Sequence, residues 1–430
     1  MVVYRIGGAP YTDRAMNAPT RTKLLVTLFA AQVCGSTAHS MSMAVGSIMA
    51  AGIAGTNTAS GLAVGVAALG AALASWPLAR WMAVAGRRPG LALGYALGGA
   101  GTVLGMVGVT IHNLSLFLVG MTLFGLGSTS NLLARYAAAD VSPGARRGRA
   151  MGLIVWGSAG GAIIGPNLMA PALTLGGLLG IDRAASAFLI SVAGYGVAAL
   201  LIEFGLRPDP LDVARTLAEH AEPGRPLAPP RPLGEILGDV RVQIALATLT
   251  VGQFVMISTT STSPVYLHDQ GHRVQTIGIA VSLHLAGMYV TSPLSGWLAD
   301  RFGRLPTIAA GALILIGATT LAGFVPGSDG VLVILGLFLN GVGWNLAFVA
   351  GSALLTDALS PAERASTQGL ADLVMGLMGA LGSTAGGMIL GVWGFTILNV
   401  VGATLVLAPL AVTVLRRPQP ASVAPWAGRS

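Results

Sequence analysis

The chain has 430 residues, of which only 24 are lysine or arginine and 16 are aspartate or glutamate. Charged residues therefore make up 9%, against about 25% in soluble proteins. This excludes an ordinary soluble protein. The 61 glycines lie among apolar residues without a Gly-X-Y period, which excludes a collagen-like chain. The composition is typical of closely packed membrane helices.

Apolar stretches in chain order predict the membrane spans, because a helix needs about 20 apolar residues to cross the hydrocarbon core. Residues 24–79 and 89–134 are each long enough for two helices, and residues 150–181 and 184–202 supply a fifth and a sixth. Four single spans are predicted after a polar stretch, in residues 242–268, 274–299, 305–328 and 330–356. Residues 365–415, interrupted only by Asp372, supply two more. The sequence therefore predicts twelve spans.

The basic residues predict how the chain is oriented in the membrane. An even number of spans places both termini on one side, and no cleavable signal peptide is expected before the first span. With residue 1 in the cytoplasm, only Arg183 and Arg273 of the 24 basic residues fall on the outer side. The positive-inside rule predicts this asymmetry, which accounts for the net charge of +8 without a nucleic-acid partner. We therefore expect both termini to be cytoplasmic.

A long polar segment divides the chain into two similar halves. Residues 207–241 are rich in proline and read as a cytoplasmic linker with one short helix near residues 212–220. We expect a six-helix half in residues 1–206 and another in residues 242–430, which includes the C-terminal tail. Pairs of residues repeat at an offset of 217: Gly86-Arg87 with Gly303-Arg304, Asp140 with Asp357, Arg147 with Arg364, and Gly152 with Gly369. Such a duplication is typical of transporters that hold substrate between their halves and alternate its access.

One loop carries a recognisable signature. The run Gly296-Trp-Leu-Ala-Asp300-Arg301-Phe-Gly303-Arg304 resembles the Gly-x-x-x-Asp-Arg-x-Gly-Arg signature of the Major Facilitator Superfamily. The resemblance implies an all-α integral membrane protein with twelve transmembrane helices in two pseudo-symmetric halves. It also implies that Asp300, Arg301, Gly303 and Arg304 form a gate at the cytoplasmic side. Ala83 and Val84 occupy the equivalent places of Asp300 and Arg301 in the first half, so we expect a one-sided latch.

Histidine and methionine inside the spans predict a site for a soft metal ion. His284 with Met288, and His39 with Met43, are spaced i and i+4, which places each pair on one face of a helix. Met256 lies in the seventh span. Imidazole and thioether ligands together favour Cu(I), so these five residues form a candidate copper site at the centre of the protein. Helix packing is the alternative interpretation for His39 and Met43.

A second resemblance bears on the cargo. Residues 260–304, with Gly343-Trp344-Asn345 and Gln368-Gly-Leu-Ala-Asp372, resemble the CcoA-like branch of the superfamily, which includes bacterial copper importers and riboflavin importers. The resemblance implies a secondary transporter in the bacterial cytoplasmic membrane, with copper import as the first hypothesis. The copper importers carry Met-x-x-x-Met in the seventh span. Met256 matches the second methionine of that pair, whereas Gly252 replaces the first.

Transport of a small organic molecule such as a flavin or a drug is the alternative, with Trp156, Gln253, Trp344 and Asn345 in the pocket. Copper would depend on histidine and methionine, whereas an organic molecule would depend on aromatic and amide groups. A receptor or sensor that kept the fold but lost transport is a third hypothesis. No P-loop or hydrolase motif occurs, so we expect neither an enzyme nor an ATP-driven pump. We expect a monomer in the lipid bilayer that needs no cofactor.

Several charged or titratable residues have two interpretations. Asp372, well inside the eleventh span, is predicted to exchange the coupling proton, or else to be a structural partner of Asn345 or of nearby backbone. Arg135, near the end of a span, is expected to extend toward the membrane surface. His268, Asp269 and His272 lie in an outer loop, where they either collect a metal ion or are simply solvated.

Overall fold

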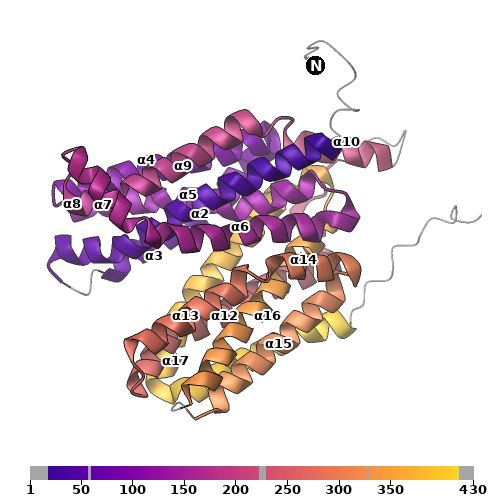
Figure 1. Ribbon diagram of the computed structural model, residues 1–430. Helices are drawn as coiled ribbons and strands as arrows, with labels where there is room; N and C mark the ends of the chain where they lie inside the picture. The colour runs from indigo at the N-terminus through magenta and orange to yellow at the C-terminus, as the bar shows by residue number, and fades with distance from the viewer. Residues whose placement is uncertain (1–17, 57–59, 222–228, 327–328, 416–430) are drawn as a thin grey trace, which may run out of the picture.

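The protein is a bundle of long helices, seen here in a computed structural model. The structure describes residues 18–56, 60–221, 229–326 and 329–415, and no β-strand occurs in these ranges. Figure 1 shows two groups of helices, one in indigo to magenta and one in orange to yellow, which correspond to the two halves of the chain.

The first half contains five long helices, several short ones and one bend. Its elements are α2 (Ala18–Ala54), α3 (Ser60–Ala85), α4 (Arg87–Thr110), α5 (Leu114–Asp140), η2 (Gly144–Arg146), α6 (Arg147–Asn167), α7 (Met169–Leu178), α8 (Arg183–Ser186), α9 (Leu189–Leu200) and the π-helical η3 (Leu201–Gly205). The pair α6 and α7 bends by 53° just after Pro166. Proline cannot donate a backbone hydrogen bond, which weakens the helix at this point.

The linker and the second half follow. The elements are α10 (Pro210–Ala221), α11 (Leu233–Gly238), α12 (Val240–Asp269), α13 (Val274–Tyr289), α14 (Ser292–Arg301), α15 (Arg304–Phe324), α16 (Gly330–Asp357) and α17 (Pro361–Leu415). The helix α10 lies where the short linker helix was expected, while linker residues 222–228 lie outside the described ranges. Within α17, Gly394 has φ of 83°, so two helices meet there.

The prediction of twelve spans is confirmed. In the described residues, nine helices are long and apolar enough to cross a membrane, and two bent pairs bring the number to eleven. One of the nine, Pro361–Val412, contains the break at Gly394 and therefore supplies two spans.

Small residues allow the helices to approach closely. A Cβ atom at Gly311 of α15 would lie 2.9 Å from the backbone nitrogen of Ala347 in α16. A Cβ atom at Gly343 would likewise lie 2.9 Å from the backbone nitrogen of Leu315. Glycine at such contacts permits backbone-to-backbone packing, which explains the high glycine content.

The two halves meet mainly through α3 with α17 and through α6 with α14. A Cβ atom at Gly148 of α6 would lie 2.7 Å from the carbonyl oxygen of Gly296 in α14. These contacts lie toward one end of the bundle, which we call the basic end because Arg87, Arg147, Arg304 and Arg364 lie there. In Figure 1 the halves converge near α14 and diverge toward α7 and α13. The structure is thus closed at the basic end.

A candidate substrate cavity and the charged network beneath it

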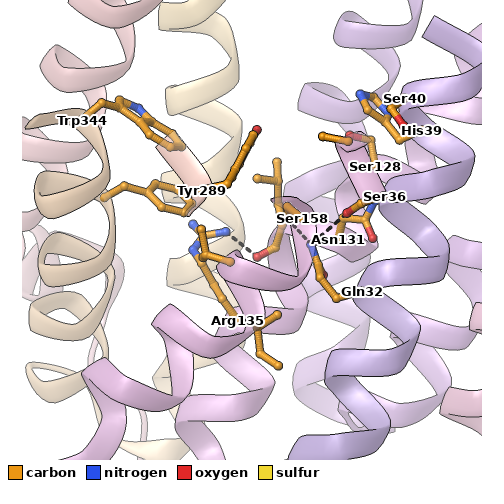
Figure 2. A pocket seen from close by; sticks show the side chains of 15 residues that line it. Gln32, Ser36, His39, Ser40, Ser128, Asn131, Arg135, Ser158, Tyr289 and Trp344 are labelled. Atoms are coloured by element: carbon orange, nitrogen blue, oxygen red, sulfur yellow. Dashed lines mark hydrogen bonds between the residues drawn. The ribbon is translucent and has the colours of Figure 1, made fainter. Parts of the chain in front are cut away.

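A cavity lies between the halves. Its empty space is about 680 Å³ when space open to solvent is included. The helices α2, α5 and α6 line it from the first half, and α13 and α16 line it from the second. Figure 2 shows the two walls facing each other. The side chains of the two walls differ sharply in chemistry.

The wall from the first half is polar. The amide nitrogen Nε2 of Gln32 donates to Ser158 Oγ at 2.8 Å, and Asn131 Oδ1 accepts from the Tyr95 hydroxyl at 2.9 Å. These bonds fix the two amide groups at the cavity surface. The remaining Gln32 Oε1 and the His39 Nδ1 are buried and have no hydrogen-bond partner among the described residues. Both atoms line a cavity, so a bound molecule could satisfy them.

The wall from the second half is aromatic. The rings of Trp344 and Phe348 stack with centroids 4.6 Å apart and planes 14° apart. Tyr289 meets Trp344 edge to face at 6.5 Å. Trp344 Nε1 donates to Gln253 Oε1 at 2.9 Å, which holds the indole ring in place. Together these rings offer a flat apolar surface to the cavity.

An ion pair between the halves lies beside the cavity. Arg135 of α5 lines it, and its Nη2 lies 2.5 Å from Asp372 Oδ1 of α17. Arg135 is 1% exposed, so the expectation that it extends toward the membrane surface is wrong. The reason is the carboxylate on the facing helix, which gives the guanidinium a buried partner. Asp372 pairs with Arg135, and Asn345 is not its partner.

Below this pair, two carboxylates at the basic end each hold two arginines. Asp140 accepts from Arg87 at 2.9 Å and from Arg364 at 3.1 Å. Its counterpart Asp357 accepts from Arg304 at 3.0 Å and from Arg147 at 2.6 Å. In each set one arginine comes from the same half and one from the other half. The repeat of 217 residues therefore reappears as two equivalent clusters joining the halves.

Asp300 joins the halves in a different way. Its Oδ1 and Oδ2 accept from the backbone nitrogens of Gly148 and Arg149, each at 2.9 Å, in the first turn of α6. Arg304 donates to the same carboxylate at 2.5 Å. A carboxylate at a helix N-terminus satisfies free amides and favours the helix dipole. Asp300 is thus a cap supplied to the first half by the second.

The other residues of the signature loop have separate positions. Gly303 has φ of 99°, a value that favours glycine, and it makes the turn that starts α15. Arg301 is exposed and makes no ion pair within the described ranges. Ala83, at the equivalent place of Asp300, has no side chain that could cap a helix.

The model for the Major Facilitator Superfamily matches residues 28–276 and 267–430. The chain belongs to this superfamily. It is therefore a multi-pass membrane transporter that works by alternating access, and not an enzyme, as the sequence predicted.

Relatives and solved structures agree with this assignment. The chain is 31% identical over 405 residues to the uncharacterized MFS-type transporter YddS of Bacillus subtilis, with 92% of each chain covered. It is 27% identical over 403 residues to the riboflavin transporter RfnT of Brucella anthropi, covering 93% of this chain and 97% of that one. The fold is similar to the E. coli fucose:proton symporter FucP, with a TM-score of 0.72, 16% identity and coverage of 94% and 99%.

In this superfamily transporter, the predicted copper ligands are not gathered at the cavity. His284 is buried, with Nδ1 2.9 Å from the Leu337 carbonyl oxygen and Nε2 3.0 Å from Thr260 Oγ1. Met256 and Met288 are buried as well, and only His39 of the five predicted ligands lines the cavity. Met43 packs against the hydrophobic core.

The predicted outer-loop site is open. His268 Nδ1 lies 3.7 Å from Asp269 Oδ1, and both side chains are largely exposed. A Cβ atom at Gly330 would lie against the ring of His272, which therefore lies beside the start of α16. No group of three or more His, Cys, Asp or Glu residues with metal-binding geometry occurs in the described part of the chain.

Of the four residues predicted to bind an organic substrate, some lie at the cavity and others do not. Trp344 lines the cavity, and Gln253 supports it from behind. Asn345 is fully buried, and its Nδ2 donates to the Met288 carbonyl at 2.6 Å, so it ties α16 to the end of α13. Trp156 is 43% exposed and stacks on Phe29 outside the cavity.

Sequence reasoning missed most of the polar wall and the partner of Asp372. Ser158 and Asn131 belong to no motif of the sequence, so nothing there distinguishes them from the other polar residues of the spans. The pairing of Arg135 with Asp372 could have been inferred from the sequence. The two residues carry opposite charges near the ends of spans four and eleven, and their counterparts at the offset of 217, Ser352 and Val155, are uncharged.

Proposed function

We propose that the chain transports a small organic molecule with a planar aromatic ring and several hydrogen-bonding groups, for which a flavin is the working example. The observation that carries this proposal is the chemistry of the cavity, with stacked Trp344 and Phe348 on one side and Gln32, His39 and Asn131 on the other. A planar ring would stack on the aromatic wall and direct its polar edge to the amide wall.

The relatives support the same class of cargo. Among them is a riboflavin transporter that is 27% identical to this chain over nearly the whole length of both. This agrees with the resemblance to a branch that contains riboflavin importers.

Copper import has less support. A Cu(I) site needs several soft ligands around one position, and among the described residues the cavity lining contains His39 as its single histidine and no methionine. Each ring nitrogen of His284 already has a hydrogen-bond partner, and the Nδ1 contact to a carbonyl oxygen requires a proton on Nδ1. Binding of copper at Nε2 would displace Thr260.

Proton coupling is part of the proposal. Asp372 is a buried carboxylate whose ion pair with Arg135 joins the two halves beside the cavity. Its protonation would weaken that pair and favour separation of the halves below the cavity, which couples proton movement to opening. Asp300 and the two clusters around Asp140 and Asp357 would hold the basic end closed until then.

The orientation completes the proposal. We assign the basic end to the cytoplasm of a bacterial cell, with the chain acting as a monomer in the cytoplasmic membrane. In Figure 1 the described chain begins and ends at this side, while residues 1–17 and 416–430 lie outside the described ranges.

Uptake into proteoliposomes tests the function. We expect a radiolabelled flavin, either riboflavin or riboflavin 5′-phosphate, to accumulate under a proton gradient and the gradient's removal to abolish accumulation. Trp344→Ala should reduce uptake at least tenfold, whereas His284→Asn should reduce it less than threefold once expression is matched. Copper uptake that requires His284 and Met288, without flavin uptake, would contradict this proposal. Accumulation of no substrate under any gradient would favour a sensor.

A further inference from the structure

The guanidinium of Arg135 has many partners besides Asp372. It donates to the Ser352 hydroxyl at 3.1 Å, to the Tyr136 hydroxyl at 3.0 Å and to the Leu132 carbonyl oxygen. Its central carbon also lies 4.2 Å from the ring centre of Tyr136 and 4.3 Å from that of Phe348. Cation–π contacts of this kind hold a guanidinium in position. Arg135 would therefore stay in place if its ion pair were lost.

The groups around Asp372 determine the net charge that its protonation would leave at the cavity. The titratable and charged groups near it are Arg135 and Tyr136 of α5 and Arg87 of α4, and Arg87 has Asp140 as its own partner. The cavity lining contains no carboxylate in the described residues. When Asp372 takes up a proton, the cavity therefore gains one positive charge without a compensating group. A buried charge without a partner is costly, which favours binding of an anion.

The position of Arg135 relative to the aromatic wall makes such binding geometrically reasonable. Phe348 contacts both residues: its ring stacks on that of Trp344, and the central guanidinium carbon of Arg135 lies 4.3 Å from its ring centre. Figure 2 shows Arg135 below Tyr289, between the aromatic side chains on the left and Gln32 on the right. Phe348 and Arg135 both line the cavity, so a cargo ring that contacts Phe348 there would have the guanidinium beside it.

From these observations we infer that the cargo is an organic anion. Its carboxylate or phosphate group binds Arg135 in exchange for Asp372, which has accepted the coupling proton. The inference rests on the proposed function, because it assumes that the cavity binds an aromatic cargo. The proton goes to the carboxylate of Asp372, the Arg135–Asp372 ion pair is replaced by a pair of Arg135 with the cargo, and no net charge remains unpaired. The competing interpretation is that the pair only fastens the halves together.

Two flavins that differ in charge test the inference. Riboflavin is neutral, and riboflavin 5′-phosphate carries the same ring with an anionic group. With purified full-length protein in detergent at neutral pH, we expect Asp372→Asn to bind riboflavin 5′-phosphate about tenfold more tightly than wild type does. Its affinity for riboflavin should stay within twofold of wild type. The double variant Arg135→Gln/Asp372→Asn should lose the gain, and Arg135→Lys/Asp372→Asn should keep part of it. An equal gain for both flavins, or binding of the phosphate without any gain in affinity, would overturn the inference.

A second measurement is independent of flavin recognition. Fluorescence of Trp344, obtained as the difference from a Trp344→Phe background, can be quenched by anionic iodide or neutral acrylamide. In Asp372→Asn we expect iodide quenching to increase at least twofold and acrylamide quenching to stay unchanged. Absence of flavin binding together with increased iodide quenching would overturn the flavin class but retain the anion site. Unchanged iodide quenching would overturn the anion site whatever the flavins do. Gel filtration of each variant checks that it is folded.

Discussion

Arg135 and Ser352 occupy equivalent positions in the two halves, 217 residues apart, and Arg135 Nε donates to Ser352 Oγ at 3.1 Å. Two equivalent residues can contact each other only near the axis that relates the halves. The guanidinium therefore lies close to the pseudo-twofold axis, beside the cavity. The two halves differ in side chain at this position, because one contributes an arginine and the other a serine hydroxyl.

We expect removal of one partner of the Arg135–Asp372 pair to be much more damaging than removal of both. Arg135→Met leaves a buried carboxylate unpaired, which costs about 3–5 kcal/mol, whereas Arg135→Met/Asp372→Leu leaves no buried charge and should be close to wild type in stability. Unfolding in detergent, followed by fluorescence, measures the difference. Equal destabilisation by the single and the double variant would contradict this prediction.

We expect Asp300→Ala to shift the protein toward a form that is open at the basic end. The substitution removes a cap worth about 1 kcal/mol from the first turn of α6, which corresponds to roughly a fivefold change in the ratio of closed to open forms. Spin labels at Arg146→Cys and Phe302→Cys, in a Cys34→Ala background, can measure the distance across this interface.

Asp209→Ala is the matched control for this cap. Asp209 accepts from the backbone nitrogens of Arg87 and Arg88, at 3.0 and 2.8 Å, so it also caps a helix start, that of α4. Its partners lie in the first half, which directly precedes Asp209 in the chain, so this cap does not join the two halves. Its removal should leave the distribution of spin-label distances as in wild type. A similar shift in both variants would mean that the distances report general loosening.

We expect the two equivalent carboxylates to differ in their sensitivity to substitution. The side chains of Asp140 and Arg87 are fully buried, whereas those of Asp357 and Arg147 are 29% and 17% exposed. Asp140→Asn would leave two buried guanidinium groups without a counter-charge, while water can solvate the groups around Asp357. The transport rate should fall several-fold further in Asp140→Asn than in Asp357→Asn. The temperature of thermal unfolding should also fall further in Asp140→Asn. Equal effects would contradict the role assigned to burial.

We expect Met288→Leu to leave transport within about twofold of wild type. The residue is buried in the helix packing, and leucine has a similar volume, so the cost in stability should stay below about 1.5 kcal/mol. A metal-binding role would instead require the sulfur atom. Initial rates of flavin uptake and of copper uptake at matched expression distinguish the two roles. A loss of copper uptake beyond tenfold would restore the copper hypothesis.

The sequence predicted the number of spans because spans depend on local composition. Apolar stretches and the basic residues between them need no knowledge of tertiary contacts. The bend after Pro166 and the break at Gly394 were harder to predict, because glycine and proline are frequent throughout these helices and only some of them interrupt a helix.

The site was predicted less well, since it depends on which helix faces meet. His284 and Met288 share a helix face as expected, but that face packs against α12 and α16 instead of the cavity. Arg135 was expected at the membrane surface because its partner on α17 lies 237 positions away in the chain. The type of a side chain determines its chemistry, but its role depends on how five helices pack around the cavity.

The cap that Asp300 places on α6 makes two backbone amides into reporters of the transport cycle. The first turn of a helix has no internal acceptor for its amide hydrogens, so Gly148 and Arg149 depend on the opposite half for protection from water. Each time the basic end opens, these amides become free to exchange with solvent. Their rate of deuterium uptake therefore measures the fraction of time that the unmodified transporter spends open toward that side.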